Sequence, residues 1–157
     1  VGGTGSTIGG VTGVTVNGTD GPITGATLAP GTAIYGFELK RNTSSLSQNT
    51  TKNFENGTIY WEQVLTAVFY KYDQDKRNQL KILGQNDKLQ VIAVDQNDVQ
   101  YWLGQTNGMY LSGGSAATGT AYGDRNGFEM IFTGQEPQPA NVISGTIQEV
   151  FGVAPIG

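Results

Sequence analysis

The chain has 157 residues, a net charge of -4 and 14% charged residues, and it contains no Cys and no His. This length suits one domain with its own core, whereas the acidic balance argues against a nucleic-acid surface that neutralises phosphates. The lack of Cys and His excludes disulfides, thiolate nucleophiles, the usual zinc sites and a Ser-His-Asp triad, and no apolar run is long enough to span a membrane.

Both ends of the chain are nearly without charge. Residues 1–37 carry one charged side chain, Asp20, and residues 137–157 carry one, Glu149. Uncharged, β-prone ends invite strand pairing, so they either complete the sheets of their own domain or pair with a neighbouring subunit; both alternatives stay open. The expected division of the chain is a Gly/Thr-rich N-terminal arm (1–31), a β-sandwich domain (32–143) and a C-terminal strand or arm (144–157).

The next part of the chain reads as a strand, a polar loop and a long strand. Residues 33–40 alternate in the pattern of a β-strand. Residues 42–57 are rich in Asn, Ser and Thr, and a structureless loop of this length is uncommon unless it is functional or mobile. Residues 58–72 are apolar on both faces, as expected of a strand at the centre of a sandwich or of a multi-subunit barrel.

The following part reads as one short helix, then strands and turns. Asp73 is a suitable N-cap for a helix over residues 74–83 that stops at Gly84. Further strands are expected over residues 88–95, 99–104, 109–111 and 127–134. Residues 96–98 form the turn of a hairpin between the first two. The predicted fold class is therefore mainly β: a β-sandwich or partial barrel with one short helix and an extended N-terminal arm.

A Gly-rich segment over residues 113–127 joins the last two of these strands. It matches neither the Walker motif nor the dinucleotide fingerprint, and a strand follows it, so there is no helix N-terminus to hold a phosphate. Its glycines permit close backbone approach, while Ala116 and Ala117 leave room for a neighbour. We therefore expect a loop that becomes ordered against another copy of the chain.

Acidic residues offer two kinds of candidate site, and both have a simpler explanation. Five aspartates could bind calcium, but no EF-hand pattern is present and acids near turns are ordinary turn chemistry; they are Asp73, Asp75, Asp95, Asp98 and Asp124. Four glutamates could supply a glycosidase pair, but nothing brings two of them together, and solvated strand faces explain them; they are Glu38, Glu62, Glu129 and Glu136. We expect no metal, no cofactor and no enzyme activity.

Aromatic residues could line a sugar-binding platform. The candidates are Tyr60, Trp61, Tyr70, Tyr72, Tyr101, Trp102 and Tyr110. At strand positions, aromatic side chains more often pack in a core or across strands. We therefore expect them to be structural.

The order of the segments resembles a known family. The long strand Ile59-Tyr-Trp-Glu-Gln-Val-Leu-Thr-Ala-Val-Phe-Tyr-Lys-Tyr72 precedes a lone helix, Lys76-Arg-Asn-Gln-Leu-Lys-Ile-Leu83. Then come Leu89-Gln-Val-Ile-Ala-Val-Asp95, Tyr101-Trp-Leu-Gly104, the Gly/Ala/Thr loop and Gly127-Phe-Glu-Met-Ile-Phe-Thr-Gly-Gln-Glu-Pro137. This arrangement resembles the phage tail tube proteins, or related structural proteins of phages that infect Bacteroides-like bacteria. The resemblance covers about residues 32–143.

Members of that family fold as a β-sandwich flanked by one helix and form hexameric rings, which stack into a tube for DNA or effectors. The resemblance implies a homo-oligomer in a virion or an extracellular tube-like particle, with DNA passing through the lumen without specific binding and with no membrane. It makes residues 42–57 a ring-stacking arm, whereas the Gly-rich N-terminal arm departs from the family. The interface is then expected at Asn42, Ser45, Asn49, Asn53, Gly113, Ala116, Ala117, Gly119 and Tyr122.

Two other functional classes stay open. One is another virion structural protein, such as a capsid decoration protein or a head-tail connector. The other is a secreted β-sandwich module that binds carbohydrate.

Overall fold

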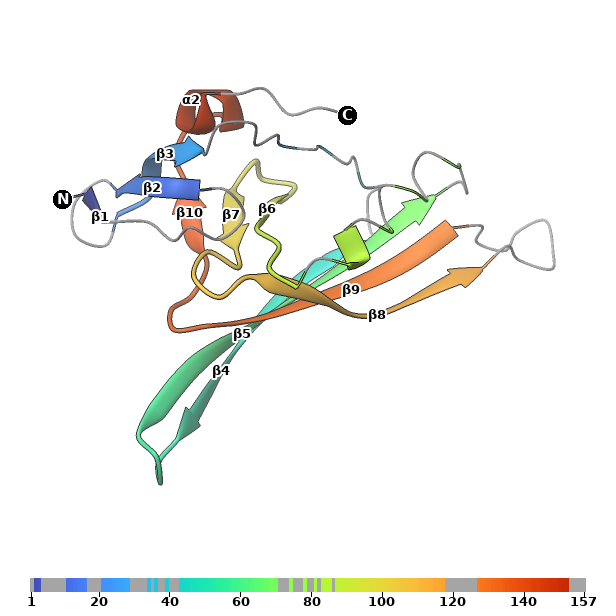
Figure 1. Ribbon diagram of the computed structural model, residues 1–157, viewed down its shortest axis with the longest axis horizontal. Helices are drawn as coiled ribbons and strands as arrows, with labels where there is room; N and C mark the ends of the chain where they lie inside the picture. The colour runs from blue at the N-terminus through green and yellow to red at the C-terminus, as the bar shows by residue number, and fades with distance from the viewer. Residues whose placement is uncertain are drawn as a thin grey trace.

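The described part of the chain folds into two β-sheets and a short helix, α2 (Ile147–Phe151) (Figure 1). This computed structural model describes residues 2–3, 11–16, 21–28, 34, 36, 39, 43–70, 74, 78, 81, 83–85, 87–117 and 127–152. Neither sheet closes into a barrel over these residues, and the predicted mainly β, sandwich-like fold is confirmed.

The two sheets have six and four strands. The order in the larger sheet is β1 (Gly2–Gly3), β2 (Val11–Val16), β3 (Ile23–Leu28), β10 (Asn141–Ile143), β7 (Gln100–Leu103) and β6 (Val91–Val94). The order in the smaller sheet is β4 (Ser45–Asn53), β5 (Thr58–Tyr70), β9 (Gly127–Glu136) and β8 (Met109–Ala117).

Alternation along β5, at the centre of the smaller sheet, decides which side chains enter the core. Leu65 and Ala67 lie two residues apart, so they point to the same face, and both are buried. Leu65 lies opposite Phe132 of β9. The core cluster between the sheets consists of Leu65, Leu103, Met109, Met130 and Phe132.

Adjacent residues of β7 point to opposite faces of the larger sheet, and this gives the domain two core clusters. Leu103 enters the cluster between the sheets, whereas Trp102 packs on the other face. The Trp102 ring meets that of Phe151 edge to face, with centroids 5.2 Å apart and an interplanar angle of 62°. The second cluster consists of Ile23, Trp102, Ile143, Val150 and Phe151, so α2 adds a third layer (Figure 1).

Within the C-terminal strand or arm expected over residues 144–157, residues 147–151 form helix α2 and not a strand, and residues 153–157 lie outside the described part of the chain. Thr146 caps it: the threonine Oγ1 accepts a hydrogen bond from Glu149 N at 3.2 Å, and Glu149 Oε2 accepts one from Thr146 N at 2.9 Å. This reciprocal capping box satisfies two backbone donors that the first turn leaves unpaired. The helix ends at Gly152, which has a left-handed φ of 70°.

Strand β3 belongs to the folded domain and not to an arm. Ile23 is fully buried and pairs in parallel with Ile143, and Ser144 N donates a hydrogen bond to Ile23 O at 2.8 Å. On its other side β3 pairs antiparallel with β2. The arm expected over residues 1–31 therefore contains strands of the larger sheet. Of the two alternatives, these strands complete a sheet of their own domain.

Two predicted elements are described only in part. Of the strand predicted over residues 33–40, the described residues are Ile34, Gly36 and Leu39, and none of them lies in a strand. Of the helix predicted over residues 74–83, the described residues are helical and agree with the prediction; they are Gln74, Asn78, Lys81 and Leu83. The predicted stop, Gly84, is itself still helical. The predicted β6–β7 hairpin is confirmed, with its turn at residues 96–98.

Buried polar side chains hold the turn that follows β7. Gln63 is 1% exposed, and its Oε1 accepts a hydrogen bond from Gly104 N at 3.0 Å. Glu136 is 3% exposed, and its two carboxylate oxygens accept hydrogen bonds from Thr106 N at 3.0 Å and Asn107 N at 2.8 Å. Because backbone donors are costly to leave unpaired, these two side chains fix the connection between β7 and β8.

Glu136→Ala is expected to lower the free energy of unfolding by about 3 kcal/mol, because it removes the acceptors of two hydrogen bonds to a carboxylate. Glu136→Gln is expected to cost about half as much, since its amide keeps one oxygen acceptor. Urea unfolding followed by circular dichroism measures both values. Equal losses in the two variants would contradict a role for the second carboxylate oxygen.

Candidate assembly interface

The segment predicted to be a polar loop contains a β-strand. All nine residues of β4 pair with β5 in continuous register. Leu46 packs against the core between the sheets, and Gln48 Oε1 accepts a hydrogen bond from Ala140 N at 3.0 Å. The prediction of a loop over residues 42–57 is therefore wrong for β4, and the hairpin turn is confined to residues 54–57.

Strand β4 is one edge of the smaller sheet, and three of the expected interface residues lie on it. Ser45, Asn49 and Asn53 are exposed and share the face turned away from the core. Within the described residues, β5 is the one strand that pairs with β4, so the other side of β4 presents backbone donors and acceptors to a further strand. Asn42 lies outside the described residues.

Strand β8 is the opposite edge of the same sheet, and it is longer than predicted. It pairs with β9 as far as Ala117, which lies opposite Gly127. The prediction of a loop is therefore wrong for residues 113–117, and three expected interface residues, Gly113, Ala116 and Ala117, lie on this edge strand. The expected residues Gly119 and Tyr122 lie outside the described part of the chain.

The two edges are equal in length and nearly uncharged. Each has nine residues; β4 carries Lys52 as its one charge and β8 carries none. Edge strands usually carry charges or prolines that discourage pairing with other chains. Two other features limit pairing at β8: the backbone of Met109 already bonds to that of Leu89 on the outer side of the strand, and a bulge lies at Ser112 between Leu111 and Gly113. Beyond the bulge, residues 113–117 return to regular register.

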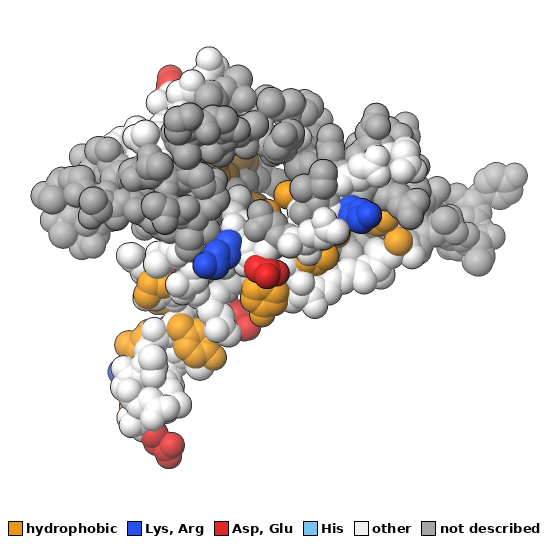
Figure 2. All heavy atoms as spheres, viewed as in Figure 1, with side chains coloured by type: hydrophobic (Ala, Val, Ile, Leu, Met, Phe, Trp, Pro, Cys, Tyr) orange, Lys and Arg blue, Asp and Glu red, His pale blue; other side chains and the backbone are white. Residues whose placement is uncertain are grey.

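The hairpin of β4 and β5 projects beyond the rest of the sheet (Figure 1). Strand β9 accompanies β5 only as far as Trp61, so the last three residue pairs of the hairpin have no third strand among the described residues. The exposed fraction of the side chain is 83% for Phe54 and 47% for Ile59. Figure 2 shows hydrophobic side chains along this projection. Because a two-stranded hairpin alone is marginally stable in water, its exposed apolar tip is a candidate contact site.

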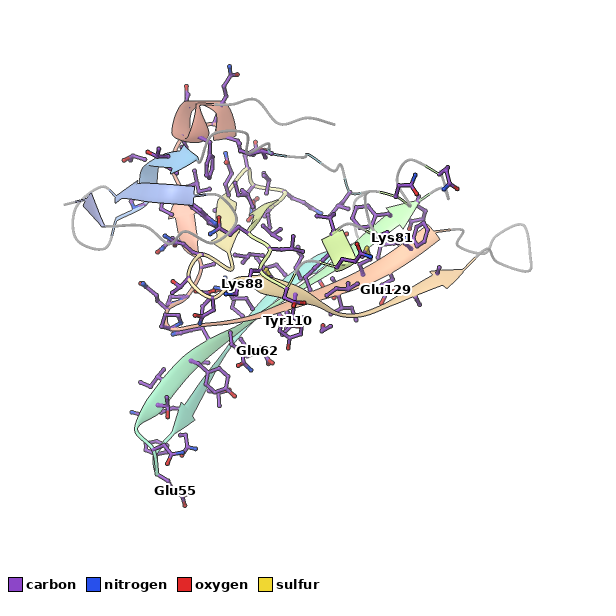
Figure 3. All side chains as sticks on the ribbon, in the orientation of Figure 1. Glu55, Glu62, Lys81, Lys88, Tyr110 and Glu129 are labelled. Atoms are coloured by element: carbon purple, nitrogen blue, oxygen red, sulfur yellow. The ribbon has the colours of Figure 1, made fainter. Side chains whose placement is uncertain are left out.

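The turn at the tip has a defined conformation. Asn53 Oδ1 accepts hydrogen bonds from Glu55 N at 3.0 Å and Asn56 N at 3.4 Å. Gly57 has a φ of 65°, in the left-handed region that favours glycine. Glu55 lies at the far end of the hairpin (Figure 3). The dipeptide Asn56-Gly57 before a strand is a hairpin signal that the sequence reasoning missed.

Chymotrypsin is expected to cut the unassembled protein first after Phe54, because exposed loop tips are the preferred sites of nicking. Assembly that covers the tip is expected to slow this cut by about tenfold or more. Mass spectrometry of timed digests identifies the fragments, and cleavage of a short chymotrypsin substrate peptide added to every digest serves as the reference. Equal rates of cleavage after Phe54 in both states would contradict burial of the tip.

The acidic residues do not form a metal site in the described structure. Asp95 Oδ1 accepts hydrogen bonds from Asn97 N at 2.8 Å and Val99 N at 2.9 Å, which is turn chemistry. Asp98 lies in the same turn with a φ of 59°. No group of three potential metal ligands occurs among the described residues. Asp73, Asp75 and Asp124 lie outside them.

The three candidate glutamates that the structure describes do not form a glycosidase pair either. Glu62 is on β5, and Glu129 lies opposite Val68 of the same strand. Six residues along a strand separate these positions by roughly 20 Å, more than twice the spacing that glycoside hydrolysis uses. Glu136 binds the turn after β7. Glu38 lies outside the described residues.

The candidate aromatic residues in the described part of the chain do not share one platform. Trp102 is buried against α2, and the neighbouring Tyr101 packs on the opposite face of the sheet. Trp61 and Tyr60 alternate in the same way along β5, and Tyr110 is 44% exposed on β8. Tyr72 lies outside the described residues.

Comparisons with protein-family models, with curated proteins and with solved structures give no match to this chain. No helix in the described part of the chain is long and apolar enough to cross a membrane.

Proposed function

We propose that the protein is a structural subunit that assembles with copies of itself into rings, and that the rings stack into a tube. The observation that carries this proposal is the pair of open edges, β4 and β8, on the two sides of one four-stranded sheet. The resemblance to phage tail tube proteins supports the same function and a place in a virion or a tube-like particle.

Edge pairing explains why a ring follows. The β4 edge of one copy and the β8 edge of the next are different surfaces, so their contact is heterologous, and such contacts close into rings when the rotation between copies permits. Each contact would add backbone hydrogen bonds along β4 and along the part of β8 that follows Met109, whose backbone already pairs with Leu89. In this arrangement the four-stranded sheets of all copies become one continuous sheet.

The charge of the chain suits a conduit for DNA. With a net charge of -4, the subunit does not attract phosphate groups. Glu62 and Glu129 lie on β5 and β9 of the sheet that would be shared by the copies (Figure 3). DNA would therefore pass through the lumen without being held.

Light scattering coupled to size exclusion, followed by negative-stain electron microscopy, tests the proposal. The expected result is closed rings and tubes whose proportion rises with protein concentration. Monodisperse monomers at high concentration would overturn it. Binding of soluble glycans by such monomers would support the carbohydrate-binding module instead.

A further inference from the structure

A notch opens between the two sheets, beside the edge strand β4. It has a volume of about 360 Å³, and the described residues that line it are Leu46, Gln48, Asp95 and Tyr101. Leu46 and Gln48 lie on the core-facing side of β4, Tyr101 lies on β7, and Asp95 directly follows β6. The notch therefore combines apolar walls with one carboxylate.

The polar groups of the notch are held in place by the fold. Gln48 Oε1 accepts a hydrogen bond from Ala140 N at 3.0 Å. Asp95 is fixed by the two backbone amides of its turn. A preorganised site loses less conformational freedom when a partner binds.

The tip of the β4–β5 hairpin presents the complementary chemistry. Lys52 lies opposite Ile59 across the hairpin, and its Nζ lies 5.0 Å from the centroid of the Phe54 ring. The tip therefore offers a cation beside an exposed ring and an exposed aliphatic side chain. The acidic residue of the tip, Glu55, lies at the far end of the hairpin (Figure 3).

We propose that the hairpin tip of one copy docks in the notch of a second copy in the neighbouring ring. Phe54 packs against Leu46 and Tyr101, and the Lys52 ammonium faces the Asp95 carboxylate. This inference rests on the proposed function: the edges build each ring, and the tip joins one ring to the next.

The positions of the two surfaces explain why this contact does not end after two copies. Leu46 and Gln48, which line the notch, lie at the base of the β4–β5 hairpin, and the tip lies at its opposite end. Every copy therefore carries a notch and a tip at separate places. A tip and a notch that meet between copies form a heterologous contact, and repeated translation along the hairpin direction gives an open-ended stack.

Three variants test the contact by electron microscopy and sedimentation. Phe54→Ala is expected to raise the protein concentration needed for tubes by about tenfold or more, because it removes most of the apolar surface buried at the tip. Asp95→Asn keeps the acceptor of the turn and is expected to raise that concentration about twofold to fivefold, less at high salt. Thr51→Ala is the matched control: Thr51 is exposed on β4, on the face opposite Lys52. It is expected to leave the concentration needed for tubes unchanged.

Cross-linking tests the same pairing in the wild-type protein. A carbodiimide joins amines to nearby carboxylates, so tubes built from mixed light and ¹⁵N-labelled chains are expected to yield mixed-isotope peptides that link Lys52 to Asp95. Mixed-isotope links from Lys52 to other carboxylates alone would overturn the pairing.

The outcomes separate this inference from the proposed function. Rings without tubes in Phe54→Ala support both. Normal tubes in Phe54→Ala and Asp95→Asn overturn the docking of the tip and leave the edge-paired ring standing. Wild-type protein that forms neither rings nor tubes overturns both.

Discussion

Lysine on both open edges, in the variant Asn49→Lys with Ser115→Lys, is expected to leave the protein monomeric at concentrations about tenfold or more above those at which the wild type forms rings. Both side chains are exposed, on β4 and β8. When the edges of two copies pair, each ammonium group loses water against the backbone of the partner strand, and edge lysines of this kind are what natural sheets use to prevent pairing. Light scattering and sedimentation measure the change.

The register shows why this variant is expected to keep its fold. Asn49 lies opposite Glu62, and Ser115 lies opposite Glu129, so each new lysine gains an acidic cross-strand neighbour within its own chain. Thermal unfolding of the monomer is expected to shift by no more than a few degrees. A variant that builds normal rings would exclude the two edges as the interface.

A charge-complementary variant sharpens the test. Asn49→Lys with Ser115→Glu adds one charge of each sign, so repulsion between copies is smaller and ring formation is expected to return partway toward the wild-type concentration. Because Ser115→Glu faces Glu129 within its own chain, the monomer is expected to be less stable than that of the double-lysine variant. Gln148→Lys, on the exposed part of α2, adds the same charge away from both edges and is expected to assemble normally. Equal loss of assembly in all three variants would indicate a general effect of charge and contradict edge pairing.

Ile23→Ala is expected to lower the free energy of unfolding by about 2–4 kcal/mol, a large part of the stability of a domain of this size. Ile23 is fully buried and packs with Trp102 and Ile143 in the cluster under α2, so its loss leaves a cavity. Thr24→Ala, at the exposed neighbouring position, is the matched control and is expected to cost less than about 0.5 kcal/mol. Urea unfolding gives both values.

Truncation extends the same prediction. A chain that lacks residues 1–31 loses β3 entirely and is expected to be less stable than Ile23→Ala, whereas a chain that lacks residues 1–20 keeps β3 and its pairing with β10. Urea unfolding of the two truncated chains gives the comparison. Equal stability of the two truncated chains would show that β3 contributes nothing to the domain, contrary to the burial of Ile23.

Several features of the protein could be predicted from the sequence alone, because they depend on composition or on local patterns. The absence of Cys and His removes whole classes of chemistry. A long run that is apolar on both faces predicted the strand β5, and the turn at residues 96–98 predicted the β6–β7 hairpin. An N-cap followed by helix-forming residues predicted helical structure between residues 74 and 83, where the described residues are helical.

Only the tertiary structure decided which polar segments are strands and which strands are neighbours. Strand β4 has little apolar character of its own, so its conformation comes from pairing along β5 and from Gln48 reaching Ala140. The place of β3 depends on Ile143, far along the chain, and no local pattern encodes such a pairing. The two open edges, the apolar tip and the notch follow from these long-range contacts, because an edge exists only once the order of the strands in the sheet is set.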